Sequence, residues 1–167
     1  MIFAYADPPY VGQAKRHYGD EEIDHELLVK RLVTEFADGW ALSCSSPSLR
    51  YLLPLCPEDV RVMAWVKPFA VFKPNVPVAY AWEPVIVRGG RKRTRQQPTV
   101  RDWVSANITL KKGLVGAKPA AFYHWLLDVL NVTEEDEVVD LYPGTATLAE
   151  IVAVRLAPER PREGNDG

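Results

Sequence analysis

The sequence MIFAYADPPY, residues 1–10, shows where the chain's first strand must end. Residues 2–6 form a short apolar run, which is typical of a buried strand. Pro8 and Pro9 follow almost at once, and proline neither continues a helix nor donates to a sheet ladder. The segment therefore predicts a strand that stops in a rigid loop, which carries an acid, Asp7, and an aromatic ring, Tyr10.

Apolar runs and amphipathic segments alternate along the rest of the chain. Further strands are predicted over residues 40–45, 60–66, 83–87 and 137–141, and helices over residues 20–36, 46–53, 118–130 and 148–156. Loops are expected over residues 11–19 and 67–77, and residues 100–116 show only a weak pattern. Strands alternating with helices predict an α/β domain with a mostly parallel sheet.

The composition limits the class of protein. A chain of 167 residues suits a single domain, expected over residues 1–157 with a disordered tail over residues 158–167. It has no apolar run of roughly eighteen residues and no signal peptide, so we expect a cytoplasmic protein without a membrane span. Cys44 and Cys56 lack metal-ligand spacing and the three histidines are scattered, so we expect no metal.

Two loops follow predicted strands and carry polar or glycine residues. One is residues 7–10, and the other is residues 140–147, with the sequence DLYPGTAT. Ligands of open α/β sheets bind at the carboxyl ends of the strands. The two loops lie at opposite ends of the chain, yet a parallel sheet would allow them to be neighbours.

One hypothesis for the first loop is that its target is an exocyclic amine of a nucleobase. The lone pair of such an amine is delocalised into the ring, so two acceptors that hold its hydrogens would help the nitrogen attack. The Asp7 carboxylate and the Pro8 carbonyl are candidate acceptors, since Pro9 biases Pro8 towards an extended backbone. Tyr10 offers a face for base stacking, worth about 1–3 kcal/mol. The base would have to leave its duplex first.

Asp7, Pro8, Pro9 and Tyr10 together resemble the catalytic motif of the S-adenosylmethionine-dependent amino-methyltransferases. Residues 140–147 are similar to the family's cofactor loop, Lys118-Pro119 to the element before its cofactor strand, and residues 82–87 to a strand that begins with an aromatic residue and glutamate. Because the catalytic motif comes first and the cofactor loop last, the order resembles that of the circularly permuted β-type enzymes. The chain looks like a small phage or prophage DNA adenine-N6 methylase.

The resemblance implies a Rossmann-like methyltransferase fold, S-adenosylmethionine as cofactor and DNA as partner. Residues 7–10 would hold and activate the target base. The residues implied in cofactor binding are Lys118, Pro119, Phe122, Asp140, Tyr142, Pro143, Gly144 and Thr145. For Phe122 ordinary core packing is the alternative, and for Lys118-Pro119 it is a simple helix start.

The sequence departs from the family pattern at its C-terminal end. Ala146 replaces the family's second glycine. After the cofactor loop the family has a strand ending in an acid that binds the ribose, but no later acid here follows a predicted strand. We therefore expect a fold truncated after the cofactor-loop helix. A compact pocket, a pocket completed by a homodimer, and weakened or lost cofactor binding all remain open.

Basic residues gather in residues 88–101 without an acid among them. They are Arg88, Arg91, Lys92, Arg93, Arg95 and Arg101. Such a run favours contact with DNA phosphates, which adds affinity but little sequence choice. A solvated surface hairpin is the alternative.

Two other functions fit the same residues. A catalytically weakened methyltransferase fold would serve as a DNA-binding module, and an active one would also suit cytosine N4 or RNA. The recognition sequence, the oligomeric state and the biological role cannot be read from the sequence.

Overall fold

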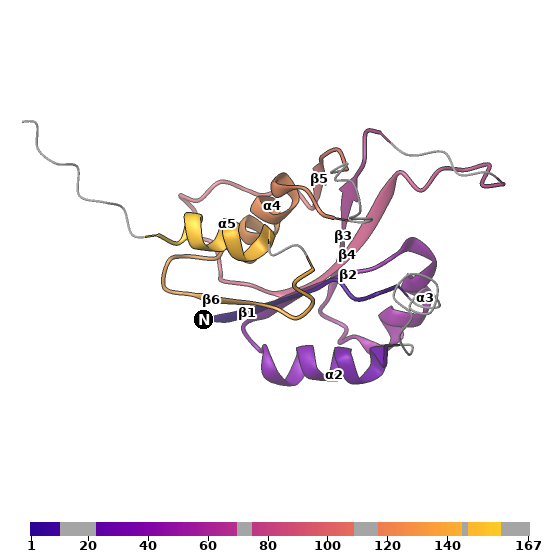
Figure 1. Ribbon diagram of the computed structural model, residues 1–167. Coiled ribbons are helices and arrows are strands. Elements are labelled where there is room, and N and C mark those ends of the chain that lie inside the picture. The colour runs from indigo at the N-terminus through magenta and orange to yellow at the C-terminus, as the bar shows by residue number, and fades with distance from the viewer. Residues whose placement is uncertain (11–22, 70–74, 109–116, 145–146, 158–167) are drawn as a thin grey trace, which may run out of the picture.

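The computed structural model describes residues 1–10, 23–69, 75–108, 117–144 and 147–157 (Figure 1). The predicted loop over residues 11–19, the loop residues Thr145 and Ala146, and the predicted tail over residues 158–167 lie outside these ranges.

The described part of the chain folds around one six-stranded sheet. Its strands are β1 Ile2–Ala6, β2 Gly39–Ser43, β3 Arg61–Val66, β4 Trp82–Gly89, β5 Trp103–Ser105 and β6 Glu137–Asp140. Every predicted strand is present. β5 was not predicted, because its three residues are too few to show a periodicity.

The sheet is mixed, with the strand order β5-β3-β4-β2-β1-β6. β1 pairs in parallel with β2 and β6, and β3 pairs in parallel with β5. β4 runs antiparallel to both of its neighbours, β2 and β3. Parallel pairings thus predominate around β1, where the predicted site lies, while β4 reverses the direction at the centre of the sheet.

Helices cover the sheet on both faces and make three layers (Figure 1). The elements are α2 His25–Glu35, the 3-10 turn η1 Ser46–Ser48, α3 Leu49–Leu52, the 3-10 turn η2 Leu53–Leu55, α4 Ala120–Leu130 and α5 Thr147–Arg155. α2 begins at His25, later than the predicted residue 20, and Asp24 caps it by accepting a hydrogen bond from the Leu27 amide at 2.9 Å. No helix of the described residues is long and apolar enough to cross a bilayer.

The side chains of β1 alternate between two apolar cores. Phe3 and Tyr5 pack on the face covered by α4 and α5, whereas Ala4 and Ala6 pack on the face covered by α2. All four are essentially buried. Because residues of a strand alternate between faces, this pattern places β1 at the centre of the molecule and fixes where its carboxyl end emerges.

β1 and β6 lie side by side although they are the first and last strands. Tyr5 pairs with Asp140, and the Leu141 amide donates to the Tyr5 carbonyl at 2.9 Å. Both strands therefore end at the same edge of the sheet, which confirms the predicted adjacency of the two loops.

Two glycines fix the opposite edge of the sheet. Gly39 at the start of β2 pairs with Gly89 at the end of β4. Gly89 has φ +70°, and a Cβ there would lie 2.7 Å from the Asp38 carbonyl oxygen, so only glycine fits without strain. Beyond it, the Arg91 amide donates to the carbonyl of Leu130, at the end of α4, at 2.9 Å. The basic segment thus leaves the sheet at the edge far from Asp7.

Candidate active site

Asp7 directly follows Ala6, the last residue of β1, at the carboxyl end of the strand. Its side chain is 22% exposed, and Pro8 behind it is buried. Among the described residues, no backbone amide donates to the Pro8 carbonyl outside regular structure. The carboxylate and this carbonyl, the two acceptors expected from the sequence, thus have capacity left for a ligand.

Lys118 is the closest partner of Asp7. Its Nζ lies 2.6 Å from Asp7 Oδ2 and 3.4 Å from Glu83 Oε2. The Lys118 side chain is only 2% exposed. Lys118 lies two residues before Ala120, the first residue of α4, and Pro119 between them is the N-cap with an extended backbone, so the predicted helix start is confirmed. The same turn directs the ammonium under the Asp7 carboxylate.

Glu83 connects this pair to two further side chains. It forms an ion pair with Lys67, which follows β3, and it accepts a hydrogen bond from the Tyr10 hydroxyl at 2.7 Å. Trp65 forms the apolar floor, with Lys67 Nζ 5.0 Å and Lys118 Nζ 5.6 Å from its ring centroid. We call Asp7, Tyr10, Lys67, Glu83 and Lys118 the Asp7 cluster.

Opposite charges are balanced in the Asp7 cluster. Burial by itself would lower the pKa of Lys118, but Asp7 and Glu83 outweigh it and the pKa is raised. Burial would likewise raise the pKa of Glu83, yet Lys118 and Lys67 hold it below its usual range. Lys118 therefore stays an ammonium and Glu83 a carboxylate at neutral pH.

For Asp7 and Tyr10, in contrast, burial is the dominant effect on the pKa. Burial raises the pKa of the Asp7 carboxyl above its ordinary value, and Lys118 offsets only part of the rise. Burial also raises the pKa of Tyr10 well above its ordinary value, so its hydroxyl keeps the proton that it donates to Glu83. Asp7 is thus the most basic carboxylate of the cluster, which suits an acceptor for a ligand's N–H.

The loop after β6 has the shape of an open turn beside Asp7. Asp140 Oδ1 accepts a hydrogen bond from the Tyr142 amide at 3.0 Å, and the Gly144 amide donates to the Tyr142 carbonyl at 2.7 Å. Gly144 is exposed, and a Cβ there would meet no atom within 4 Å. The backbone at Gly144 is therefore accessible to a ligand, which fits a cofactor lying over this loop.

Phe122 does not reach this loop's surface. Its side chain is fully buried and packs against Tyr5, Trp65, Tyr123 and Trp125, with ring centroids 5.4 to 5.9 Å away. Phe122 thus packs in the core, as the alternative expected, and its cofactor contact stays a prediction. The spacing of an aromatic residue on a helix cannot separate a ligand-facing ring from a core ring.

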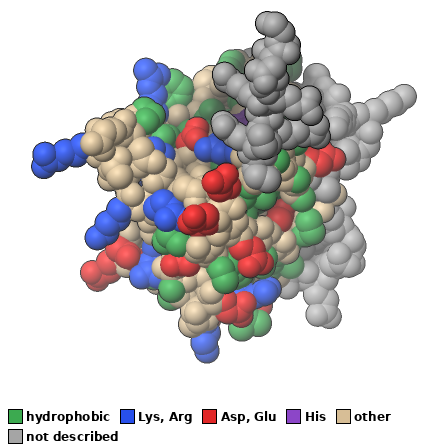
Figure 2. All heavy atoms as spheres, turned by 90° about the vertical axis from the view of Figure 1, so that its left-hand side faces the viewer, with side chains coloured by type: hydrophobic (Ala, Val, Ile, Leu, Met, Phe, Trp, Pro, Cys, Tyr) green, Lys and Arg blue, Asp and Glu red, His purple; other side chains and the backbone are tan. Residues whose placement is uncertain are grey.

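The structure does not bring the basic segment to the Asp7 cluster. Arg88 pairs with Asp59 at 2.8 Å, Arg91 pairs with the buried Asp136 at 2.6 Å, and Arg93 donates to the Asp128 carbonyl. Figure 2 shows Lys and Arg interleaved with Asp and Glu on the side of the molecule where the chain begins. These three arginines are half-buried and bind other segments of the chain, so the solvated-hairpin alternative does not describe them, and DNA contact by the segment stays a prediction.

Glu83, Lys67 and Trp65 are site residues that sequence reasoning did not assign. Lys67 directly follows the strand predicted over residues 60–66, and Glu83 begins the strand predicted over residues 83–87. Charged residues at strand ends were thus a usable signal. What was missing was the antiparallel pairing of Trp65 with Glu83, which places both at one edge.

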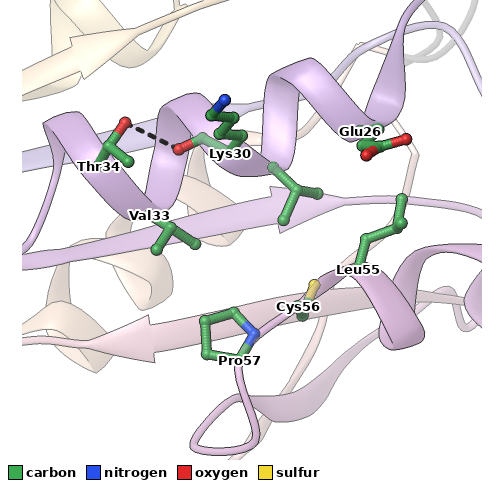
Figure 3. A pocket seen from close by; sticks show the side chains of 8 residues that line it. Glu26, Lys30, Val33, Thr34, Leu55, Cys56 and Pro57 are labelled. Carbon is green, nitrogen blue, oxygen red and sulfur yellow. Dashed lines mark hydrogen bonds between the residues drawn. The ribbon is translucent and has the colours of Figure 1, made fainter.

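Two other features lie apart from the Asp7 cluster. A groove of about 500 Å³ lies between α2 and residues 55–57, lined by Val33, Thr34, Cys56 and others (Figure 3). It contains no residue of the cluster. Among the described residues, no three His, Cys, Asp or Glu side chains gather as a set of metal ligands.

Comparisons with known proteins find similar structures but no similar sequence. No protein-family model matches the chain, and no curated protein matches it in sequence. The crystal structure of the M1.HpyAVI–SAM complex matches with a TM-score of 0.60 at 14% identity, covering 92% of this chain and 77% of that chain. A structure of M1.HpyAVI alone matches with a TM-score of 0.61 at 13% identity, covering 92% and 76%.

One of these two structures contains SAM. The present chain has a Rossmann-like methyltransferase fold. This confirms the fold expected from the resemblance. At such low identity the likeness concerns the arrangement of the backbone, so the chemistry of the chain has to be argued from its own Asp7 cluster and its loop after β6.

Proposed function

We propose that the chain transfers a methyl group from S-adenosylmethionine to the N6 amine of adenine in DNA. The observation that carries the proposal is the juxtaposition of two loops in a methyltransferase fold. The Asp-Pro-Pro-Tyr loop ends β1, the open glycine loop ends β6, and the two strands pair in parallel. A nucleobase amine on the first loop would lie beside a cofactor on the second.

The cofactor would be held by the loop after β6. Asp140, Tyr142, Pro143 and Gly144 form it, and Thr145 continues it in sequence. When bound, S-adenosylmethionine supplies a methyl group on a sulfonium sulfur, which keeps the electron pair of the carbon–sulfur bond as the target nitrogen takes the methyl. The open space at Gly144 supports this assignment.

Asp7 would grip and polarise the target amine. Its Oδ2 binds Lys118, and among the described residues no hydrogen bond is made to Oδ1. Oδ1 and the Pro8 carbonyl would each accept one N–H of the amine, which favours a pyramidal nitrogen with a localised lone pair. After transfer the nitrogen carries an excess proton, and the Asp7 carboxylate is the base that accepts it and releases it to solvent.

Tyr10 would hold the flipped base by stacking. Lys118 Nζ lies 6.0 Å from the ring centroid on one side, and we assign the other face to the base. Because Glu83 fixes the hydroxyl, the ring is oriented before the base arrives. Preorganised groups of this kind need little rearrangement as the reaction proceeds.

The finer classification also belongs to the proposal. We also propose the circularly permuted arrangement of the β-type enzymes and a small phage-type methylase, with the catalytic loop after β1 and the cofactor loop after β6. Lys92, Arg95 and Arg101 are exposed and remain candidate phosphate contacts, while Arg88, Arg91 and Arg93 bind other parts of the chain.

Calorimetric titration of S-adenosylmethionine into the folded protein, with and without DNA, tests the cofactor half of the proposal. Binding in the micromolar range is the expected result, and it would mean that the described loop and its surroundings complete a pocket. Absence of heat under both conditions, with DNA binding retained, would contradict the proposal and identify a DNA-binding module without chemistry.

A further inference from the structure

We propose that Lys118 and Glu83 are positioning residues for the Asp7 loop, in addition to the groups that touch the base. Lys118 orients the Asp7 carboxylate by binding Oδ2, and Glu83 fixes both Lys118 and the Tyr10 ring. The inference rests on the proposed methyl transfer. It reassigns Lys118 from the cofactor's neighbourhood, where the sequence resemblance put it, to the acceptor of the target amine.

The position of Lys118 is the first argument. Its side chain is 2% exposed, while that of Asp7 is 22% exposed, so the ammonium holds the carboxylate from the buried side. A carboxylate with Oδ2 held at 2.6 Å cannot turn freely about its last side-chain bond. One oxygen therefore stays directed to the site, which is the geometry that an amine donor requires.

The cost of burying an ammonium is the second argument. Desolvating a lysine is unfavourable unless good partners replace its hydration, and a helix start requires no lysine at this point. Lys118 has two carboxylates and two aromatic rings, Trp65 and Tyr10, around its Nζ. The arrangement is that of a fixed charge inside a shaped site.

Glu83 is the third argument, because it connects both parts of the base-binding loop. The same oxygen, Oε2, accepts the Tyr10 hydroxyl at 2.7 Å and lies 3.4 Å from Lys118 Nζ. Oε1 binds Lys67. A shift of Glu83 would therefore disturb the stacking ring and the amine acceptor together.

Among the described residues, charged and titratable groups of several elements influence Asp7, and they decide the sign of each variant's effect. They are Tyr5 and Tyr10 on or beside β1, Cys44 after β2, Lys67 and Glu83 at β3 and β4, Lys118 and Tyr123 at α4, and Asp140 at β6. Lys118 and Lys67 lower the pKa of Asp7, whereas Glu83 raises it.

Two variants should therefore shift the pKa of Asp7 in opposite directions. Lys118→Met removes an ammonium and the Oδ2 hydrogen bond, so the pKa of Asp7 should rise. Glu83→Gln is isosteric and removes a negative charge, so the pKa of Asp7 should fall. A role of either residue in stability alone, without a charge interaction with Asp7, predicts no such pair of opposite shifts.

The test is an NMR titration of the Asp7 carboxyl carbon in the ligand-free protein. Lys30→Met on the exposed side of α2 is the matched control, since it removes an ammonium remote from the cluster. Opposite shifts in the two variants, with none in the control, support the proposal. Should Lys118→Met fail to fold, Lys118→Arg and Glu83→Gln are compared instead. An unchanged pKa of Asp7 in Lys118→Arg and a lowered pKa of Asp7 in Glu83→Gln then support the proposal.

An unchanged Asp7 titration in Glu83→Gln, equal to that of the control, would overturn the proposal. Methylation assays form a separate arm. Lys118→Met should move the acid limb of kcat/KM to higher pH and lower kcat at neutral pH more than it changes KM for the cofactor. If the unaltered protein methylates nothing, the proposed function fails while the titration still decides whether Lys118 and Glu83 control Asp7.

Discussion

Lys118 Nζ lies 2.6 Å from Asp7 Oδ2, and this contact joins residues 111 positions apart in the sequence. It links the loop after β1 to the turn before α4, while Glu83 ties the same ammonium to β4. Three segments of the chain thus converge on one ammonium. The proposed reaction needs the Asp7 carboxylate oriented, partly accessible and basic.

Removal of Asp7 tests the acceptor role directly. Asp7→Ala should abolish methylation while leaving S-adenosylmethionine affinity within about threefold, because the cofactor loop lies on β6. The change leaves Lys118 with Glu83 as its remaining carboxylate, so folding should be checked by circular dichroism. Methylation at the unaltered rate in this variant would remove Asp7 from the mechanism.

Two variants of Tyr10 distinguish base stacking by its ring from the hydrogen bond of its hydroxyl to Glu83. Tyr10→Ala removes the ring and should reduce kcat/KM for DNA by roughly 5- to 150-fold, the equivalent of about 1–3 kcal/mol of stacking. Tyr10→Phe keeps the ring and loses only the bond to Glu83, so its loss should be much smaller. Steady-state kinetics on one duplex will compare them, and equal losses in both variants would argue against a stacking role.

The two glycines Gly89 and Gly144 make a matched pair. Gly89→Ala forces a Cβ to 2.7 Å from the Asp38 carbonyl at φ +70°, and should destabilise the fold by about 1–3 kcal/mol. Gly144→Ala meets no atom within 4 Å and should leave stability unchanged within about 0.5 kcal/mol. Its S-adenosylmethionine affinity should nevertheless fall. Urea unfolding and calorimetry give the two quantities, and a Gly144→Ala protein with unaltered affinity would place the cofactor elsewhere.

The depressed pKa of Glu83 predicts the direction of a pH effect on stability. Since its folded-state pKa lies below the ordinary value of 4.5, ionised Glu83 contributes stability that is complete above that pH and is lost as the pH falls through the folded-state pKa. The raised pKa of Asp7 acts in the opposite sense, because folding favours its protonated form. The stability difference between the unaltered protein and Glu83→Gln should therefore shrink as the pH is lowered below 4.5. Urea midpoints across that range measure it, and a difference independent of pH would contradict the assigned charge.

Variants of Arg91 and Arg95 test whether residues of the basic segment stabilise the fold or contact nucleic acid. Arg91 binds the fully buried Asp136 side chain, so Arg91→Gln should lower the melting temperature. Arg95 is exposed, so Arg95→Gln should leave the melting temperature unchanged and, if it contacts a phosphate, reduce the salt dependence of DNA binding. Differential scanning calorimetry and DNA titration at two salt concentrations check both. A stable Arg91→Gln protein would contradict the structural role.

The sequence allowed the strands around the site to be predicted because each is a short apolar run with a clear end, as with residues 2–6 before the two prolines. It also gave the adjacency of the two loops, since parallel strands end at one edge. The pairing of β4 between β2 and β3 could not be read, because antiparallel partners are chosen by long-range packing. Glu83 and Lys67 were missed for that reason.

The basic segment shows why surface charge could not be predicted from the sequence. A run of arginines without acids in the sequence is matched in space by acids from elsewhere, such as Asp59 and Asp136. Charge balance is a property of the folded surface, so a run of one sign in the sequence predicts an electropositive patch only where no distant segment supplies the opposite charge.

Transfer of a labelled methyl group tests the central claim most directly. The protein is incubated with DNA and S-adenosylmethionine that carries a deuterated methyl group, and the digested nucleosides are analysed by mass spectrometry beside the Asp7→Ala protein. The account predicts labelled N6-methyladenine with the unaltered protein and none with the variant. Label in N4-methylcytosine would move the proposal to cytosine, and the absence of label from every base, with cofactor and DNA both bound, would contradict it.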